Sequence, residues 1–140
     1  MPKRYFDEGD PYFLHCQETT ELVAKALGLA KGAYQMVFQS LFGKEEWLRP
    51  YADETIKQMA RDGVRSMAVI CPGFSADCLE TLEEMAIGNR ALFLEHGGQV
   101  YEYIPALNAQ SAHIGLLVDL VKQHAQGWRG FEKVDVYREG

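Results

Sequence analysis

The stretch SMAVICPGFSADCLETLEEMA, residues 66–86, decides the fold, because an apolar run stops at a Pro-Gly turn and a helical pattern follows. The near-continuous apolar run at 66–72 is typical of a strand that is buried on both faces of a parallel sheet. The helical pattern begins at Asp77, and the glycines at 97 and 98 predict its end. A strand that leads through a turn into a helix is part of a βαβ unit, so this stretch predicts an α/β protein.

The rest of the chain continues this alternation of strands and helices. Strands are predicted at 34–40 and 100–105, a loop at 41–50, and helices at 10–29, 51–63 and 108–126. Asp10 with Pro11, and Asn108 or Ser111, are the expected helix caps. We therefore predict one α/β domain, residues 1–140, built as a three-layer parallel sheet with helices on both faces. The tail, 127–140, has no clear pattern.

Composition excludes several classes of protein. With 47% hydrophobic and 24% charged residues, the chain is neither disordered nor fibrous. A net charge of −6 without a Lys/Arg cluster argues against a nucleic-acid partner. No apolar run reaches the length of a membrane-spanning helix. The odd set of three cysteines, Cys16, Cys71 and Cys78, indicates free thiols in a reducing compartment, so we expect a cytoplasmic protein.

Acidic residues follow the strand at 66–72, where ligands bind in open α/β sheets. Glu80 and Glu84 lie four residues apart and would share one face of a helix, where they could hold a divalent cation or relay protons. Cys78 could add a sulfur ligand. The structural alternative is a capping box of Asp77 and Glu80, with the other carboxylates stabilised by the helix dipole. Spacing alone favours this alternative.

The loop at 41–50 and its approach are rich in large apolar side chains. They could form a lip that grips a flat aromatic ligand, or they could fold back into the core. The members of this lip are Phe38, Leu41, Phe42, Trp47 and Leu48. The four histidines share no spacing that indicates a metal site.

Four segments together resemble ferrochelatase, bacterial type, the enzyme family that inserts ferrous iron into protoporphyrin IX to form protohaem. The matching segments are PKRYFDEGDPY at 2–12, FQSLFGKEEWLRPYADETI at 38–56, CPGFSADCLETLEE at 71–84 and YEYIPALN at 101–108. The resemblance covers only the C-terminal half of the enzyme, which is built from two similar α/β halves that face one cleft.

This resemblance implies roles for six residues. Glu80 would be a catalytic residue that binds metal or handles protons, and Glu84 a second catalytic residue on the same acidic path. The residues implied in substrate binding are Gln39, Ser40, Trp47 and Leu48. The resemblance implies protoporphyrin IX and ferrous iron as substrates, the N-terminal half as a partner, and no permanently bound cofactor. Because the tail lacks cysteine, we expect no iron–sulfur cluster.

Two departures from the family pattern matter. The family's histidine shortly before the PKRY motif would precede Met1, and the position two turns past Glu80 is Gly88. We therefore expect little or no chelatase activity from this chain alone. The alternatives are a non-catalytic half-domain that self-associates, and a short homodimeric chelatase in which His15 or another histidine substitutes.

Overall fold

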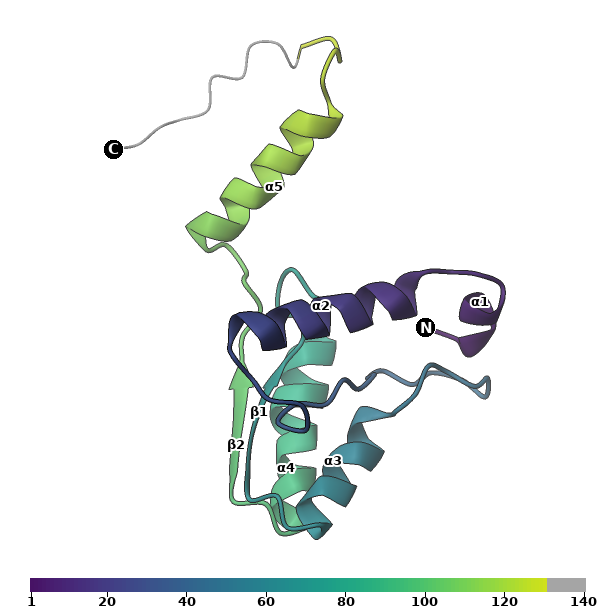
Figure 1. Ribbon diagram of the computed structural model, residues 1–140, viewed down its shortest axis with the longest axis vertical. Coiled ribbons are helices and arrows are strands. Elements are labelled where there is room, and N and C mark those ends of the chain that lie inside the picture. Colours follow the sequence, from purple (N-terminus) through teal and green to yellow (C-terminus); the bar gives the residue numbers. More distant parts are fainter. Residues whose placement is uncertain (131–140) are drawn as a thin grey trace. The chain divides into compact units, whose positions relative to one another are not determined.

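The computed structural model describes residues 1–130, so most of the tail at 127–140 lies outside the described residues. The chain divides after Ala106 into two compact units. The first contains α1 (Lys3–Asp7), α2 (Tyr12–Ala26), α3 (Ala52–Arg61), β1 (Ser66–Ile70), η1 (Glu80–Gly88), α4 (Asn89–Glu95) and β2 (Val100–Ile104); the second contains α5 (Ser111–His124). Figure 1 shows these elements along the chain. None of the helices in residues 1–130 is long and apolar enough to cross a membrane.

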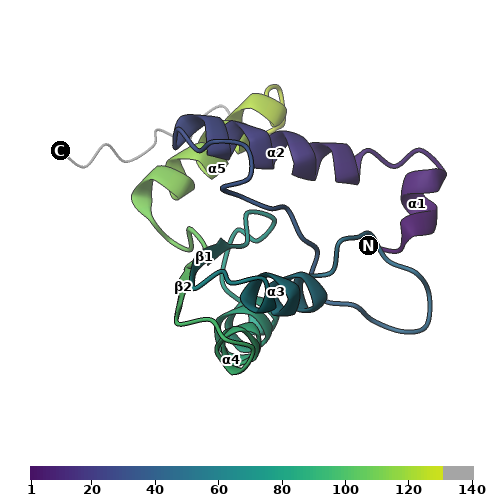
Figure 2. The same ribbon diagram turned by 60° about the horizontal axis from the view of Figure 1, so that its bottom comes forward.

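The centre of the first unit is a parallel pair of strands covered by helices. β1 and β2 pair so that Met67 lies opposite Tyr101 and Val69 opposite Tyr103. Side chains alternate across a sheet, so these four residues share one face. That face packs against α3, η1 and α4, whose inward residues are Ile56, Ala60, Met85 and Phe93. Helices α3 and α4 lie side by side in Figures 1 and 2. The α/β class is confirmed.

Two strand predictions are wrong in part or in full. The strand at 66–72 forms, but Ser66, Ala68 and Ile70 are exposed, so it is not buried on both faces within the described chain. The predicted strand at 34–40 does not form. Its Phe38 makes an isolated bridge to Tyr51, because this segment runs beside the start of α3 and has no strand as a neighbour.

The helix predictions hold, with differences at the ends. α2 begins at Tyr12 with Pro11 at the N-cap position, one residue later than expected, and the carboxylate of Asp10 accepts a hydrogen bond from the Tyr12 N–H (2.8 Å). The helix at 51–63 is α3, which stops before Gly63 in the left-handed region (φ +98°). For α5, neither Asn108 nor Ser111 is the cap: the position belongs to Gln110, whose side chain makes no cap bond.

The helix predicted at 77–98 is a widened π-helix, η1, followed by α4. A wider turn changes the partners of the backbone carbonyl groups, and buried polar side chains supply extra donors. Asn89 donates to the Glu84 carbonyl through its backbone N–H and its Nδ2 (3.0 Å), and the Tyr101 hydroxyl donates to the Met85 carbonyl (2.8 Å). Burial raises the pKa of Tyr101, so its hydroxyl stays protonated and can donate.

Replacing Gly98 tests how tightly α4 is closed against the sheet. A Cβ at position 98 would overlap the ring of Phe93, which is fully buried. We expect Gly98→Ala to lower the free energy of unfolding by about 1–3 kcal/mol, measured by urea denaturation. Gly115→Ala is the matched control: a Cβ there has no neighbour within 4 Å, and alanine favours a helix. Equal stability of the two variants would contradict this packing.

Candidate functional site

A cavity of about 410 Å³ lies at the carboxyl end of β1. Its lining includes Tyr12, His15 and Cys16 of α2 and the turn after β1. Three of the four residues predicted to bind substrate, Gln39, Ser40 and Trp47, also line it. The walls are mostly apolar and aromatic, with a few polar groups, which is typical of a ligand pocket.

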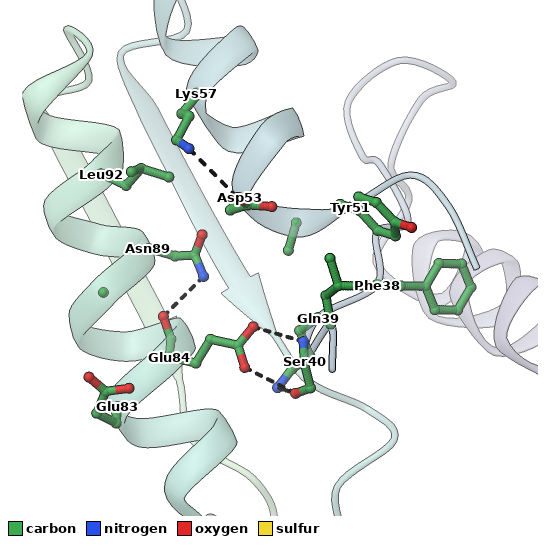
Figure 3. A pocket seen from close by; sticks show the side chains of 13 residues that line it. Phe38, Gln39, Ser40, Tyr51, Asp53, Lys57, Glu83, Glu84, Asn89 and Leu92 are labelled. Atoms are coloured by element: carbon green, nitrogen blue, oxygen red, sulfur yellow. Dashed lines mark hydrogen bonds and ion pairs between the residues drawn. The ribbon is translucent and has the colours of Figure 1, made fainter. Parts of the chain in front are cut away.

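A second cavity, of about 360 Å³, shares the segment 38–40 as a wall with the first. Figure 3 shows its charged lining, in which Lys57 pairs with Asp53 (3.6 Å) and Glu83 and Glu84 come from η1. Asn89 is 4% exposed, and within residues 1–130 its Oδ1 has no hydrogen-bond partner.

Gln39 connects the shared wall to the turn after β1 and to η1. Its Oε1 accepts a hydrogen bond from the thiol of Cys71 (3.1 Å), and its Nε2 donates to the backbone carbonyl of Glu80 (3.0 Å). Burial raises the pKa of the Cys71 thiol to about 11, so the thiol stays protonated and acts as a donor at neutral pH. Both ends of the Gln39 amide are therefore occupied.

Ser40 forms the second connection between the wall and η1. Its backbone N–H donates to Oε1 of Glu84 (2.8 Å) and its hydroxyl donates to Oε2 (3.0 Å), as Figure 3 shows. Ser40 has φ +64°, the left-handed region that favours glycine. Such a conformation costs about 1–3 kcal/mol and persists only where the surroundings hold it. The Glu84 carboxylate accepts both hydrogen bonds, and the Ser40 hydroxyl also accepts one from Nε2 of Gln39 (3.4 Å).

Glu80 differs from Glu84 in its environment. Its side chain is exposed and lines neither cavity. A hydrogen bond from the Cys78 thiol, and then one from its own backbone N–H, hold the pKa of Glu80 below the usual value. The carboxylate is therefore ionised at neutral pH and open to solvent. No group of three or more His, Cys, Asp or Glu side chains in residues 1–130 is placed to hold a metal ion.

Thr81 and Tyr103, to which the sequence assigned no role, make hydrogen bonds at the start of η1. The expected capping box of Asp77 and Glu80 does not form; instead the Cys78 N–H donates to Oγ1 of Thr81 (3.0 Å). The carboxylate of Asp77 accepts from Thr81 (3.0 Å) and from the hydroxyl of Tyr103 (2.7 Å). The Glu80 carboxylate takes no part in these bonds and accepts instead from the Cys78 thiol and from its own backbone N–H. In the sequence, the sign of this arrangement was Thr81, a hydrogen-bonding residue directly after Glu80.

The side chains of the predicted apolar lip do not form one continuous surface. Leu48 is 4% exposed and lines neither cavity, so it has folded back. Trp47 is half-buried in the first cavity wall, whereas Phe42 is 82% exposed. The N-terminal segment holds this loop through hydrogen bonds from Lys3 N–H to the Glu46 carbonyl (2.8 Å) and from Leu48 N–H to the Met1 carbonyl (3.0 Å).

Comparison with known proteins gives a consistent result. A family model described as Ferrochelatase matches residues 1–125. Curated relatives named Ferrochelatase include those of Nitrosococcus oceani, 59% identical over 91% of this chain and 35% of the relative, and Pseudoalteromonas atlantica, 57% identical over 91% and 36%. A relative from Streptococcus mutans, named Coproporphyrin III ferrochelatase, is 56% identical over 88% and 39%. The chain spans about a third of the length of these relatives.

Removing the thiol beside Glu80 tests its electrostatic environment. Cys78→Ala deletes the hydrogen bond that contributes most to lowering the pKa of Glu80, so we expect that pKa to rise toward 4.5. Carbon-13 NMR titration of the glutamate carboxyl groups measures the shift. Cys16→Ala, which removes a thiol on α2, should leave the pKa of Glu80 unchanged. An unchanged titration in Cys78→Ala would show that the thiol does not act on this carboxylate.

Proposed function

Because the chain belongs to the ferrochelatase family, we propose that it forms part of a site at which ferrous iron is inserted into a porphyrin. In this proposal Gln39, Ser40 and Trp47 contact the porphyrin in the first cavity, and Leu48 supports Trp47 from behind. Glu80 attracts the iron, and the family resemblance gives Glu84 a place one turn further along the same helix. Protoporphyrin IX and Fe²⁺ are the substrates, and protohaem is the product.

One observation carries most weight: residues implied by the family resemblance line one cavity at the carboxyl end of a parallel strand. Ligands of open α/β sheets bind at this edge. The segment that bears Gln39 and Ser40 is also hydrogen-bonded to η1, which bears both carboxylates. Hydrogen bonds therefore join the proposed porphyrin wall at 38–40 to η1, the helix proposed to attract iron.

The chemistry asks for a group with the properties of Glu80. Metalation removes two pyrrole protons, strips water from Fe²⁺ and forms bonds from the ring nitrogens to iron. An exposed carboxylate with a lowered pKa is ionised at neutral pH, which suits it to attract the hydrated cation. The same lowered pKa makes Glu80 a weak proton acceptor. We therefore propose that its main role is to deliver the iron, and that other groups accept the pyrrole protons.

The proposal extends to the whole protein. Since the chain spans about a third of its relatives' length, we propose that the complete cleft needs the N-terminal half, and that these residues alone have little activity. In that context residues 1–140 would form one domain of a three-layer sheet, with a cytoplasmic location. A self-associating inactive half and a short homodimeric chelatase remain the competing hypotheses. Sedimentation with and without porphyrin separates them, since only the homodimeric chelatase predicts a porphyrin-binding dimer.

The identity of the porphyrin has a second candidate. The Streptococcus mutans relative is named for coproporphyrin III and is about as similar to this chain as the relatives named simply Ferrochelatase. Coproporphyrin III carries more carboxylate groups than protoporphyrin IX. Iron insertion should therefore be assayed with both porphyrins, and the preferred substrate is the one with the higher kcat/KM.

Replacing Glu80 tests the proposed reaction. In the complete gene product that carries this sequence, we expect Glu80→Gln to lower kcat for iron insertion about a hundredfold or more, because the charge that attracts Fe²⁺ is lost. Haem formation is followed by absorbance, and porphyrin affinity by fluorescence quenching. Porphyrin affinity should change little, since Glu80 lines neither cavity.

The matched control is Glu95→Gln, an exposed carboxylate on α4 outside both cavities. It should insert iron at the wild-type rate. If Glu80→Gln is as active as this control, Glu80 has no role in iron insertion. If the wild-type gene product neither binds a porphyrin nor inserts iron, the proposed function itself is wrong.

A further inference from the structure

The second carboxylate of η1 has a role of its own. We propose that Glu84 is a positioning residue, which holds Ser40 and thereby sets the porphyrin-facing wall, and does not itself act on iron or on the pyrrole protons. This inference rests on the proposed function for the identity of the substrate. The contact between Glu84 and Ser40 can be tested independently of any activity.

The geometry of the carboxylate supports this assignment. Each oxygen of Glu84 accepts a hydrogen bond from Ser40, one from the backbone N–H (2.8 Å) and one from the hydroxyl (3.0 Å). Hydrogen bonds to an ionised acceptor are stronger than neutral ones. A metal ion or a pyrrole proton would have to compete with both donors, whereas Glu80 has no contact with the wall through its carboxylate.

The consequence for the wall follows from the conformation of Ser40. Its positive φ is unfavourable for serine, so the segment relaxes unless the two hydrogen bonds hold it. Gln39 is the preceding residue, and its amide is oriented by Cys71 and by the Glu80 carbonyl. Loss of the Glu84 carboxylate would therefore move the residues that line the first cavity, and porphyrin binding would suffer before the chemical step.

The distinguishing experiment compares two substitutions of the same residue. In Glu84→Gln, the side-chain oxygen can accept the Ser40 N–H, and the side-chain NH₂ can donate to the Ser40 hydroxyl, which both donates and accepts. Glu84→Ala removes both bonds. We expect Glu84→Ala to raise KM for the porphyrin about tenfold with kcat changed less than about threefold, and Glu84→Gln to behave like wild type.

A structural readout accompanies the kinetics. The amide of Ser40 should be protected from hydrogen exchange by its bond to Glu84, and NMR measures this in the full 140-residue chain. We expect protection to be retained in Glu84→Gln and lost by about tenfold or more in Glu84→Ala. Glu95→Ala is the control for the loss of an exposed carboxylate, and it should change neither quantity.

Two results would overturn the inference. Glu84→Gln could lose iron insertion as fully as Glu84→Ala while its Ser40 amide stays protected, which would make Glu84 a reacting carboxylate. Alternatively, Glu84→Ala could keep the Ser40 amide protected, which would show that other contacts hold the wall. A wild-type protein without chelatase activity removes the proposed substrate, and the exchange measurement still decides whether Glu84 holds Ser40.

Discussion

The segment at 38–40 has no strand to join, and its attachment to η1 determines the shape of the site. Gln39 donates to the Glu80 carbonyl, and one helical turn later Glu84 accepts two bonds from Ser40. Backbone and amide groups that leave water need such partners. The same few hydrogen bonds therefore keep two cavities apart, fix a strained serine and tie the loop that carries Trp47 to the helix that carries the carboxylates.

The parts of the fold that sequence predicts well are those whose signals are local. A near-continuous apolar run predicts β1, and the apolar face with its closing Gly63 predicts α3. The failures depend on neighbours. An apolar, aromatic run at 34–40 resembles a strand, but no local pattern says whether a partner strand lies beside it. The widened turn of η1 similarly depends on Asn89 and on Tyr101, a residue on another element.

For the candidate site too, the sequence indicates the residues but not the contacts that position them. Family resemblance indicates Gln39, Ser40 and Trp47, and all three line one cavity. The contacts that position them join residues 41 and 44 positions apart, which spacing within a helix or loop cannot reveal. The prediction of a capping box failed for a related reason. Asp77 bonds to Thr81 and not to Glu80, and it also accepts a hydrogen bond from Tyr103 on β2, a contact that local sequence does not reveal.

Two carboxylates on one helix face are therefore not equivalent, although the sequence treats them alike. Both carboxylate oxygens of Glu84 accept hydrogen bonds from Ser40, so Glu84 helps to hold the wall that a rigid, flat ligand would contact. The exposed carboxylate of Glu80 stays ionised, because hydrogen bonds from the Cys78 thiol and from its own backbone N–H lower its pKa. A site that must grip a macrocycle and admit a hydrated cation needs both properties, since a preorganised wall cannot also exchange ligands freely. Glu80 and Glu84 lie one helical turn apart, so η1 provides both the exposed carboxylate and the one that holds the wall.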